Sequence, residues 1–288
     1  MIMAANQKFS MQAVYNQLKH VSREIKYPKN IDIDKSRTHL NYSLHPNRNM
    51  TELEYLKKRL GEIHIHSDRQ NINYMSGWVI TKPKDLSDEY EERFFKACYE
   101  FLIERYGGEQ NVVSADVHKD ESGEPHLHFC FIPVTDYEPN ENLVKIVNYF
   151  KKYPDANNTK ASEELGISRK TVRRYRNCSE DDIKREKLSA KSVINKADLQ
   201  SFHQDLQRYL DKLKIPAKVY TGITKAQGGN MTVEQLKMQR NYLLEHGGNV
   251  KEIVKTIDNI VNEGTIALQG KQSIGMYTDK FSQGKNTG

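Results

Sequence analysis

The spacing of apolar residues along the chain predicts a mixture of helices and strands. Val14, Leu18 and Val21 recur at helical intervals, which predicts a helix over residues 11–25. The same spacing predicts further helices over residues 52–61, 88–106, 195–213, 232–245 and 250–262. Short apolar runs predict strands at residues 74–81 and 217–220. In the helix at 195–213 the residues expected to face inward are Leu199, Phe202, Leu206 and Leu210.

Two segments alternate between apolar and polar residues, which is typical of half-buried strands. Residues 112–118 place Val113, Ala115 and Val117 on one face, and residues 126–134 place Leu127, Phe129 and Phe131 on one face. The connection between the two segments is short and contains Gly123, which predicts an antiparallel hairpin. The opposite face of this hairpin carries His118, His126 and His128.

These histidines form the strongest chemical signal in the sequence. His126 and His128 project from one strand face, and the hairpin returns His118 beside them. Imidazoles that converge in this way can hold a catalytic divalent cation and leave positions open for substrate oxygens. Manganese is the first expectation and magnesium the second. Asp120 and Glu121 in the turn are candidates to orient an imidazole or accept a proton.

Composition narrows the class of protein. Hydrophobic residues make up 37%, charged residues 28%, and the mean hydropathy is −0.79, values typical of a water-soluble globular chain. We expect no membrane-spanning segment and no signal peptide, and therefore a cytoplasmic location. The 3 cysteines have no C-x-x-C pair, which argues against a disulfide scaffold or a cysteine-based zinc site.

Residues 141–178 interrupt the pattern and read as an inserted module. This segment contains nine basic residues and only four acidic ones, and the difference accounts for most of the net charge of +6. Gly166 predicts a turn and Ser168 a helix cap, as in a helix-turn-helix with Ile167, Val172 and Tyr175 inward. The basic residues expected to face DNA are Arg169, Lys170, Arg173 and Arg174. We expect an accessory grip on duplex or hairpin DNA; a helical protein-binding module is the alternative.

Several motifs occur in the order found in one known family. The run from His118 to His128, with Asp120, Glu121 and Pro125 between, resembles the metal motif of the Mob/Pre plasmid-mobilisation relaxases, relatives of the histidine-hydrophobe-histidine endonucleases. The block Ser36–Leu44 is similar to the S-R-x-H-L-N-Y-x-L block of that family, and His20-Val-Ser-Arg23 to its H-x-x-R motif. Further matches occur at residues 78–81, 199–206 and 230–237.

The resemblance implies a fold and an activity. The expected fold is α+β, with a central antiparallel sheet, helices on one face of it, and the small helical insertion. The expected activity is nicking of one DNA strand at a plasmid transfer origin, leaving the enzyme covalently joined to the 5′ phosphate, and later rejoining the strand. A metal ion would act as Lewis acid and template.

The resemblance also assigns roles to single residues. It implies that His20 is the nucleophile and that Arg23 binds phosphate or stabilises developing charge, with Glu121 taking a proton from His20 or orienting it. Related relaxases use tyrosine, so Tyr42 and Tyr15 are rivals, and Tyr42 alternatively shapes the site or stacks on a base. Expected DNA contacts outside the insertion are Arg37, Asn41 and Arg69, with His39 as a further candidate.

The expected organisation follows from these matches. Residues 1–140 and 179–240 would form the relaxase domain, 141–178 the insertion, 241–269 a helical extension and 270–288 a disordered tail. The expected partners are single-stranded and duplex DNA at the origin, with relaxosome and coupling proteins as further candidates. The alternatives are a rolling-circle replication initiator with similar metal chemistry and a non-catalytic DNA-binding regulator.

Overall fold

The core of the protein is an antiparallel sheet. A computed structural model describes residues 4–24, 33–66, 72–121 and 123–219. Within these ranges the sheet has five strands in the order β1-β3-β5-β4-β2. The strands are β1 (Ala4–Phe9), β2 (Tyr42–Ser43), β3 (Met75–Thr81), β4 (Val112–His118) and β5 (His126–Phe131). The predicted α+β class and antiparallel sheet are confirmed.

The predicted hairpin is strands β4 and β5. His118 lies opposite His126 in the register, and Asp116 lies opposite His128. The register shifts between Val112 and Ser114, a β-bulge that adds one residue to β4. The bulge turns Val113 toward the histidine face, so its assignment to the same face as Ala115 and Val117 was wrong.

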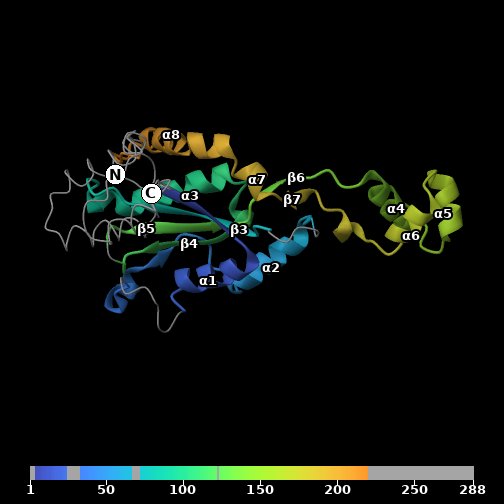
Figure 1. Ribbon diagram of the computed structural model, residues 1–288, viewed down its shortest axis with the longest axis horizontal. Helices are drawn as coiled ribbons and strands as arrows, with labels where there is room; N and C mark the ends of the chain where they lie inside the picture. The colour runs from blue at the N-terminus through green and yellow to red at the C-terminus, as the bar shows by residue number, and fades with distance from the viewer. Residues whose placement is uncertain (1–3, 25–32, 67–71, 122, 220–288) are drawn as a thin grey trace, which may run out of the picture. The chain divides into compact units, whose positions relative to one another are not determined.

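Helices cover both faces of the sheet, not one as predicted. Helices α3 (Glu91–Arg105) and α8 (Lys196–Lys212) pack on one face, and helices α1 (Met11–Val21) and α2 (Glu52–Glu62) pack on the other (Figure 1). The physical reason is that both faces of the strands are apolar. Trp78 stacks on Phe202 at 3.6 Å between ring centroids on the α3 and α8 face. On the other face the buried set includes Val14, Leu56, Met75, Cys130 and Ile132.

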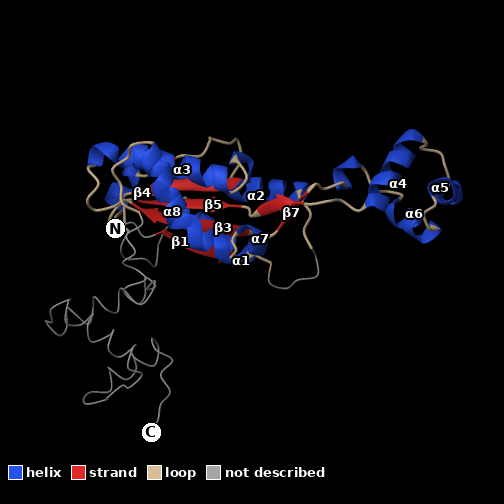
Figure 2. Cartoon of the chain, turned by 90° about the horizontal axis from the view of Figure 1, so that it is seen from above, coloured by secondary structure: helices blue, strands red, loops and turns tan. Residues whose placement is uncertain are grey.

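The inserted segment forms its own helical module. Helices α4 (Glu141–Lys152), α5 (Asn158–Leu165) and α6 (Arg169–Tyr175) surround a separate apolar cluster of Ile146, Tyr149, Phe150, Ala161, Ile167 and Val172. The chain enters and leaves the module along a two-stranded ribbon that the sequence pattern did not predict, β6 (Val134–Asp136) and β7 (Glu186–Leu188) (Figure 2). Short elements complete the described chain: η1 (Lys35–Leu40), η2 (Asp88–Tyr90), η3 (Glu109–Asn111), η4 (Glu180–Asp182) and α7 (Ala190–Val193).

Several boundaries differ from the sequence pattern. Helix α1 ends at Val21 instead of residue 25, because Ser22 caps it and Arg23 takes a left-handed conformation with φ of 59°. Leu199 is 42% exposed, so only the later apolar residues of α8 face inward. Residues 217–219 form no strand. The predicted elements at 232–262, the tail, the motif at 230–237 and Arg69 lie outside the described residues. No helix in the described ranges combines the length and apolar character needed to cross a bilayer.

Candidate histidine and carboxylate centre

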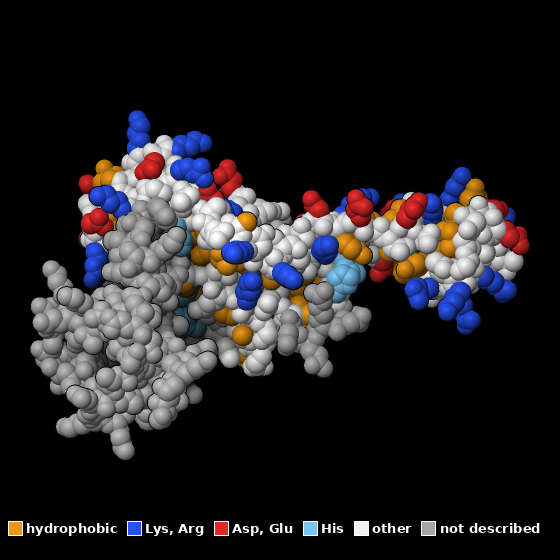
Figure 3. Space-filling view, turned by 45° about the horizontal axis from the view of Figure 1, so that its top comes forward, with side chains coloured by type: hydrophobic (Ala, Val, Ile, Leu, Met, Phe, Trp, Pro, Cys, Tyr) orange, Lys and Arg blue, Asp and Glu red, His pale blue; other side chains and the backbone are white. Residues whose placement is uncertain are grey.

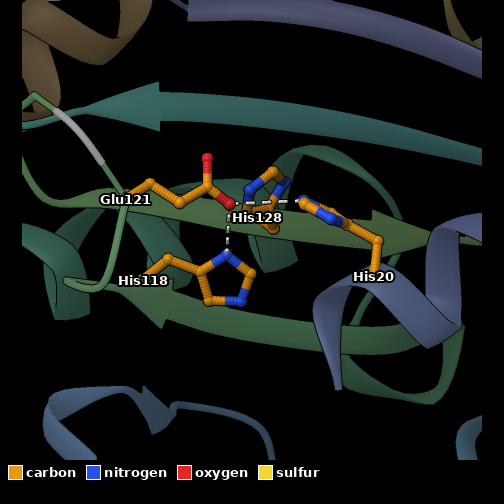
Figure 4. Close-up of side chains that lie close together, drawn as sticks. All are labelled: His20, His118, Glu121 and His128. Carbon is orange, nitrogen blue, oxygen red and sulfur yellow. Dashed lines mark ion pairs between the residues drawn. The ribbon is translucent and has the colours of Figure 1, made fainter. Parts of the chain in front are cut away.

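Four imidazoles meet at one end of the histidine face of the sheet. His118 comes from β4, His126 and His128 come from β5, and helix α1 brings His20 across this face (Figure 4). The ring centroids of His118 and His128 are 4.6 Å apart, and those of His126 and His128 are 4.9 Å apart. The His20 ring is 5.5 Å from the His128 ring. Residues separated by about a hundred positions thus form one cluster because α1 packs on this face.

Glu121 points its carboxylate into the cluster. One oxygen lies 3.5 Å from His20 Nε2 and 3.8 Å from His118 Nδ1, and the other lies 3.7 Å from His126 Nε2. Figure 4 shows the carboxylate between the His20 and His118 rings, in front of His128. One atom from each of four side chains lies within 4.8 Å of the others, a grouping suited to a metal ion: His20, His118, Glu121 and His128.

Hydrogen bonds leave ring nitrogens free to bind a cation. His118 Nε2 lies 3.0 Å from the Val21 carbonyl, and His126 Nδ1 lies 3.3 Å from the Glu124 carbonyl. Each of these nitrogens can only donate to a carbonyl, so the other nitrogen of each ring keeps its lone pair. Neither nitrogen of His128, nor Nδ1 of His118, has a hydrogen-bond partner among the described residues although these atoms are buried. Buried nitrogens without partners are costly in an ordinary core and fit a cation-binding role.

The electrostatics favour the neutral form of His20, His126 and His128 and the charged form of Glu121. Burial, with the neighbouring His118 and His126, lowers the pKa of His128 well below 6.5. Burial also lowers the pKa of His126 and of His20, although Glu121 opposes both shifts. Burial raises the pKa of Glu121, but His118, His126 and Arg23 outweigh it and bring this pKa down to about 2. Neutral imidazoles and an ionised carboxylate are the forms that bind divalent cations.

Arg23 is held by two carboxylates. Its Nη2 lies 2.6 Å from Asp120 Oδ1 and 2.8 Å from Glu121 Oε1, while Nε donates to Asp120 Oδ2 at 3.0 Å. Nη1 donates to the His20 carbonyl at 3.0 Å. The family resemblance implied that Arg23 binds phosphate or stabilises developing charge. In the structure its guanidinium donates to carboxylate and carbonyl oxygens of the protein. Arg23 therefore positions Glu121 and the end of α1 relative to each other.

Asp120 connects the hairpin turn to the segment that carries the S-R-x-H-L-N-Y-x-L motif. Its side chain is fully buried, Thr38 Oγ1 donates to Oδ2 at 2.9 Å, and the Asp34 amide donates to its carbonyl at 2.7 Å. Asn41 Oδ1 accepts the Lys119 amide at 2.7 Å. Sequence reasoning named Asp120 as a candidate to orient an imidazole or accept a proton, and Asn41 as a DNA contact. In the structure both side chains hold this segment against the turn that presents Glu121.

Tyr42 does not join the histidines. It pairs with Val117 in the sheet and packs with the core on the α3 and α8 face, opposite to the face of His118. Cross-strand neighbours share a face, so a tyrosine opposite Val117 points away from the site. Burial, together with Glu91 and Glu92, raises the pKa of its hydroxyl. The expectation that Tyr42 acts in the site was wrong.

The remaining predicted residues lie on the surface. Tyr15, named above as a rival nucleophile, is 44% exposed on α1. Arg37 and His39 are exposed in η1, which leaves both accessible to a ligand. The basic side chains of the insertion that are expected to contact DNA are all exposed on α6: Arg169, Lys170, Arg173 and Arg174.

Sequence reasoning missed Asp116. This carboxylate shares the histidine face, lies opposite His128 in the register, and has a raised pKa because it is buried, although His45 and Ser43 act against the shift. The signal was present in the alternation of β4, where Asp116 is the polar residue two positions before His118.

Comparison with known proteins agrees with this arrangement. A family model described as "Plasmid recombination enzyme" (Mob_Pre) matches residues 1–174. The chain is 34% identical over 134 residues to a plasmid recombination enzyme of Bacillus thuringiensis, covering 45% of this chain and 30% of that protein. It is 38% identical over 127 residues to a type 1 enzyme of Staphylococcus aureus, covering 41% and 30%. The matched part therefore spans less than a third of the length of these relatives.

Solved structures give the same fold. The chain resembles the MobM relaxase domain (MOBV; Mob_Pre) in a manganese-bound crystal structure with plasmid pMV158 oriT DNA. The TM-score is 0.56 and the sequence identity 23%, with 82% of this chain and 97% of that chain covered. A second crystal structure of the same domain, with a 23-nucleotide oriT DNA, has a TM-score of 0.55 at 22% identity. At this level of identity the likeness establishes the fold.

Proposed function

Because the chain belongs to the plasmid recombination enzyme (Mob_Pre) family, we propose that it is a relaxase that nicks one strand of DNA at the transfer origin of a plasmid or other mobile element. One observation carries the proposal. His20 faces Glu121, with 3.5 Å between Nε2 and Oε1, in the same cluster as the hairpin histidines. A nucleophile beside a cation site suits phosphoryl transfer.

The proposed reaction is a transesterification. A ring nitrogen of His20 forms a bond to the scissile phosphorus, and the bond from phosphorus to the 3′ oxygen breaks with its electron pair staying on that oxygen. The imidazole loses one proton and the 3′ oxygen gains one, so the proton count balances. The products are a phosphoramidate that joins His20 to the 5′ end and a free 3′ hydroxyl. Attack by a 3′ hydroxyl in the reverse direction rejoins the strand.

The surroundings of His20 support this role. Its pKa is lowered, first by burial, so a neutral nitrogen with a free lone pair is the main form at neutral pH. Glu121 has a pKa of about 2, which makes it a weak proton acceptor but a permanent negative charge. We therefore assign Glu121 mainly to orienting the His20 ring and stabilising positive charge on it, and only secondarily to accepting its proton.

The free nitrogens of the hairpin suit a divalent cation. We propose His118 Nδ1, His126 Nε2 and a ring nitrogen of His128 as its ligands, with Glu121 within reach as a further donor. His118, His128 and Glu121 belong to the compact group that also contains His20, whereas His126 lies outside that group and is included because its Nε2 is 3.7 Å from Glu121 Oε2. Manganese is the first choice, supported by the manganese-bound crystals of the MobM relaxase domain, and magnesium is the second. When bound, such an ion polarises a nonbridging phosphate oxygen and fixes the phosphate for in-line displacement.

The proposed substrate is single-stranded DNA at the nick, by analogy with the MobM relaxase domain bound to oriT DNA. Arg37 and His39 remain candidate DNA contacts because their side chains are exposed close to the segment bound by Asp120. Relaxosome and coupling proteins remain candidate partners.

The test is covalent trapping on DNA. The full chain is incubated with manganese and a pool of random-sequence single-stranded oligonucleotides, and adducts that resist denaturing detergent are separated and sequenced. We expect the parent to form an adduct whose link is labile to acid, as a phosphoramidate is, and His20→Ala to form none.

Tyr42→Phe is the matched control, and we expect it to form the adduct at the parent rate because Tyr42 lies on the opposite face of the sheet. An acid-stable adduct that persists in His20→Ala and disappears in Tyr42→Phe would move the nucleophile to the tyrosine. Failure of the parent to form any adduct would contradict the proposal and favour a DNA-binding regulator.

A further inference from the structure

The outer face of helix α6 carries cations that have no acidic partner in the part of the chain that the structure describes. Elsewhere in the module lysines pair with acids: Lys145 with Glu141 at 2.5 Å, Lys151 with Glu180 at 2.6 Å, and Lys160 with Glu164 at 3.8 Å. Within the described residues no ion pair or hydrogen bond engages the side chains of Arg169, Lys170, Arg173 and Arg174. Figure 3 shows Lys and Arg side chains standing out from the surface of the module.

The unpaired cations share one side of the helix. At about 100° per residue, positions 169, 170, 173 and 174 fall within an arc of roughly 140°. Val172 and Tyr175 fall on the opposite side, where Val172 is fully buried and Tyr175 packs against the cluster. Burial of the apolar side therefore fixes which side of α6 faces outward.

The connection between α5 and α6 is rigidly built. Gly166 takes a left-handed conformation with φ of 65°, which ends α5, and Ser168 caps α6 by accepting the Thr171 amide at 3.2 Å. Ser162 Oγ donates to the Ile167 carbonyl at 2.7 Å and closes the turn from the other side. These contacts hold α6 in place before any ligand binds, which reduces the entropy lost on binding.

We propose that the outer face of α6 binds duplex DNA. A helix fits the major groove of a duplex, and unpaired Arg and Lys side chains neutralise its phosphates. This proposal deepens the proposed function, because it rests on DNA being the substrate and adds a duplex-binding surface to the single-stranded site.

Other ligands fit this face less well. Single-stranded DNA is bound mainly by stacking on aromatic rings, and the outward positions of α6 are all Arg or Lys. A protein partner needs an apolar anchor. Among the described residues of the module, the one large hydrophobic residue that is strongly exposed is Tyr153. Tyr153 follows α4 and is not part of α6, so the outer face of α6 has no such anchor.

The module is attached through a ribbon that is itself bonded to the sheet domain. Arg59 Nη2 pairs with Glu186 of β7 at 2.7 Å and donates to Asn111 Oδ1 at 3.0 Å. Lys184 Nζ donates to the Gly61 carbonyl at 2.7 Å, and the His64 amide donates to the Glu186 carbonyl at 2.7 Å. The base of the ribbon is therefore fastened to α2, so duplex DNA held by α6 stays attached to the nicking domain.

The test compares two charge reversals in the full chain. Arg173→Glu with Arg174→Glu removes unpaired cations from α6, and Lys151→Glu with Lys160→Glu changes the net charge equally at lysines that already pair with acids. The probe is a labelled random-sequence duplex of about 30 base pairs, a length near three helical turns. Its affinity for each protein is titrated at several salt concentrations.

We expect the α6 variant to lose at least about tenfold in duplex affinity, and the slope of log affinity against log salt to fall by about 2. The control variant should stay within about threefold of the parent, since its effect is only long-range. Arg173→Gln with Arg174→Gln should show a smaller loss in the same direction, and circular dichroism checks that each variant is folded.

Equal losses in the two charge-reversal variants, or an unchanged duplex affinity in the α6 variant, would overturn the proposal. The outer face of α6 would then be assigned to binding a protein partner. Adduct formation by the parent on the single-stranded pool is measured in parallel. An adduct without duplex binding at α6 would refute the grip and keep the relaxase, whereas duplex binding at α6 without an adduct would refute the relaxase and keep the grip.

Discussion

The two faces of strands β4 and β5 differ in chemistry, although successive residues of the same two strands point alternately to one face and the other. On the α3 and α8 face, Phe129 is fully buried and packs with other aromatic residues of the core. On the α1 face its neighbour His128 is also almost fully buried, yet its ring nitrogens find no hydrogen-bond partner in the described part of the chain. Burial alone therefore does not separate a core position from a site position.

The difference lies in what each buried group lacks. An aromatic ring in a well-packed core needs no hydrogen-bond partner, whereas a buried imidazole loses its hydrogen bonds to water and forms none with the protein in their place. A cation or substrate at the histidine cluster would supply the missing interaction. Substitutions on the two faces should therefore have opposite consequences for stability and activity.

The largest expected effect comes from neighbouring substitutions that separate the faces. His128→Leu should lower the rate of adduct formation by about a thousandfold, because it removes a proposed ligand, while leaving the free energy of unfolding of the metal-free protein unchanged or raised. Phe129→Leu should destabilise the protein by about 1 kcal/mol or more and keep adduct formation by the folded fraction. Urea unfolding and single-turnover trapping measure the two quantities.

If His128→Leu destabilised the metal-free protein as strongly as Phe129→Leu and retained adduct formation, the histidine would be a core residue and the contrast between the faces would disappear. Manganese binding by each variant, followed by calorimetry, gives an independent readout, and only His128→Leu should weaken it.

A smaller effect is expected at the support of the site. Asp120→Asn weakens the buried pair with Arg23, so Glu121 and the end of α1 lose their common anchor. We expect adduct formation to fall by about tenfold to a hundredfold, as for other residues that orient a metal site, and stability to fall by about 2 kcal/mol. Glu141→Gln is the matched control, because Glu141 also pairs with a cation, Lys145, but both side chains are exposed.

Glu141→Gln should change neither adduct formation nor stability appreciably, since exposed pairs contribute little. Equal behaviour of the two variants would show that Arg23 does not depend on Asp120 for its position.

The smallest expected effect is a pH dependence carried by the histidine face. The pKa of His128 lies well below 6.5 in the folded protein, so its contribution to stability is fully present above pH 6.5 and is lost as the pH falls below that value. At one unit below the unfolded pKa the loss amounts to about 1.4 kcal/mol for one histidine held neutral. Urea unfolding in a metal chelator at pH 7.5 and 5.5 measures it.

His128→Leu should remove that share of the pH dependence, and Phe129→Leu should retain it. The same loss in both variants would place the titrating group elsewhere.

Local pattern was sufficient to predict the histidine hairpin and the turn of the inserted module. Alternation and a short connection place His118 beside His126, and Gly166 followed by Ser168 determines the turn and cap before α6. Both predictions depend on residues close together in the sequence, whose geometry follows from strand periodicity and from the conformational preferences of single residues.

Packing across the sheet decided the rest. Whether His20 or Tyr42 reaches the histidines depends on which face each enters, and Tyr42 enters the wrong one because it pairs opposite Val117. The partners of Arg23 and Asp120, the bulge that moves Val113 and the ribbon that carries the module likewise depend on contacts distant in the chain.

By itself the sequence determined the family motifs, the alternation of the hairpin and the excess of cations in the insertion. Only the tertiary structure decided that α1 and α2 cover the histidine face, that Arg23 is held by carboxylates, and that the cations of α6 find no acidic partner among the described residues while three lysines elsewhere in the module do. The physical reason is that periodicity places a side chain on a face of its own element, whereas its partners depend on which other elements pack against that face.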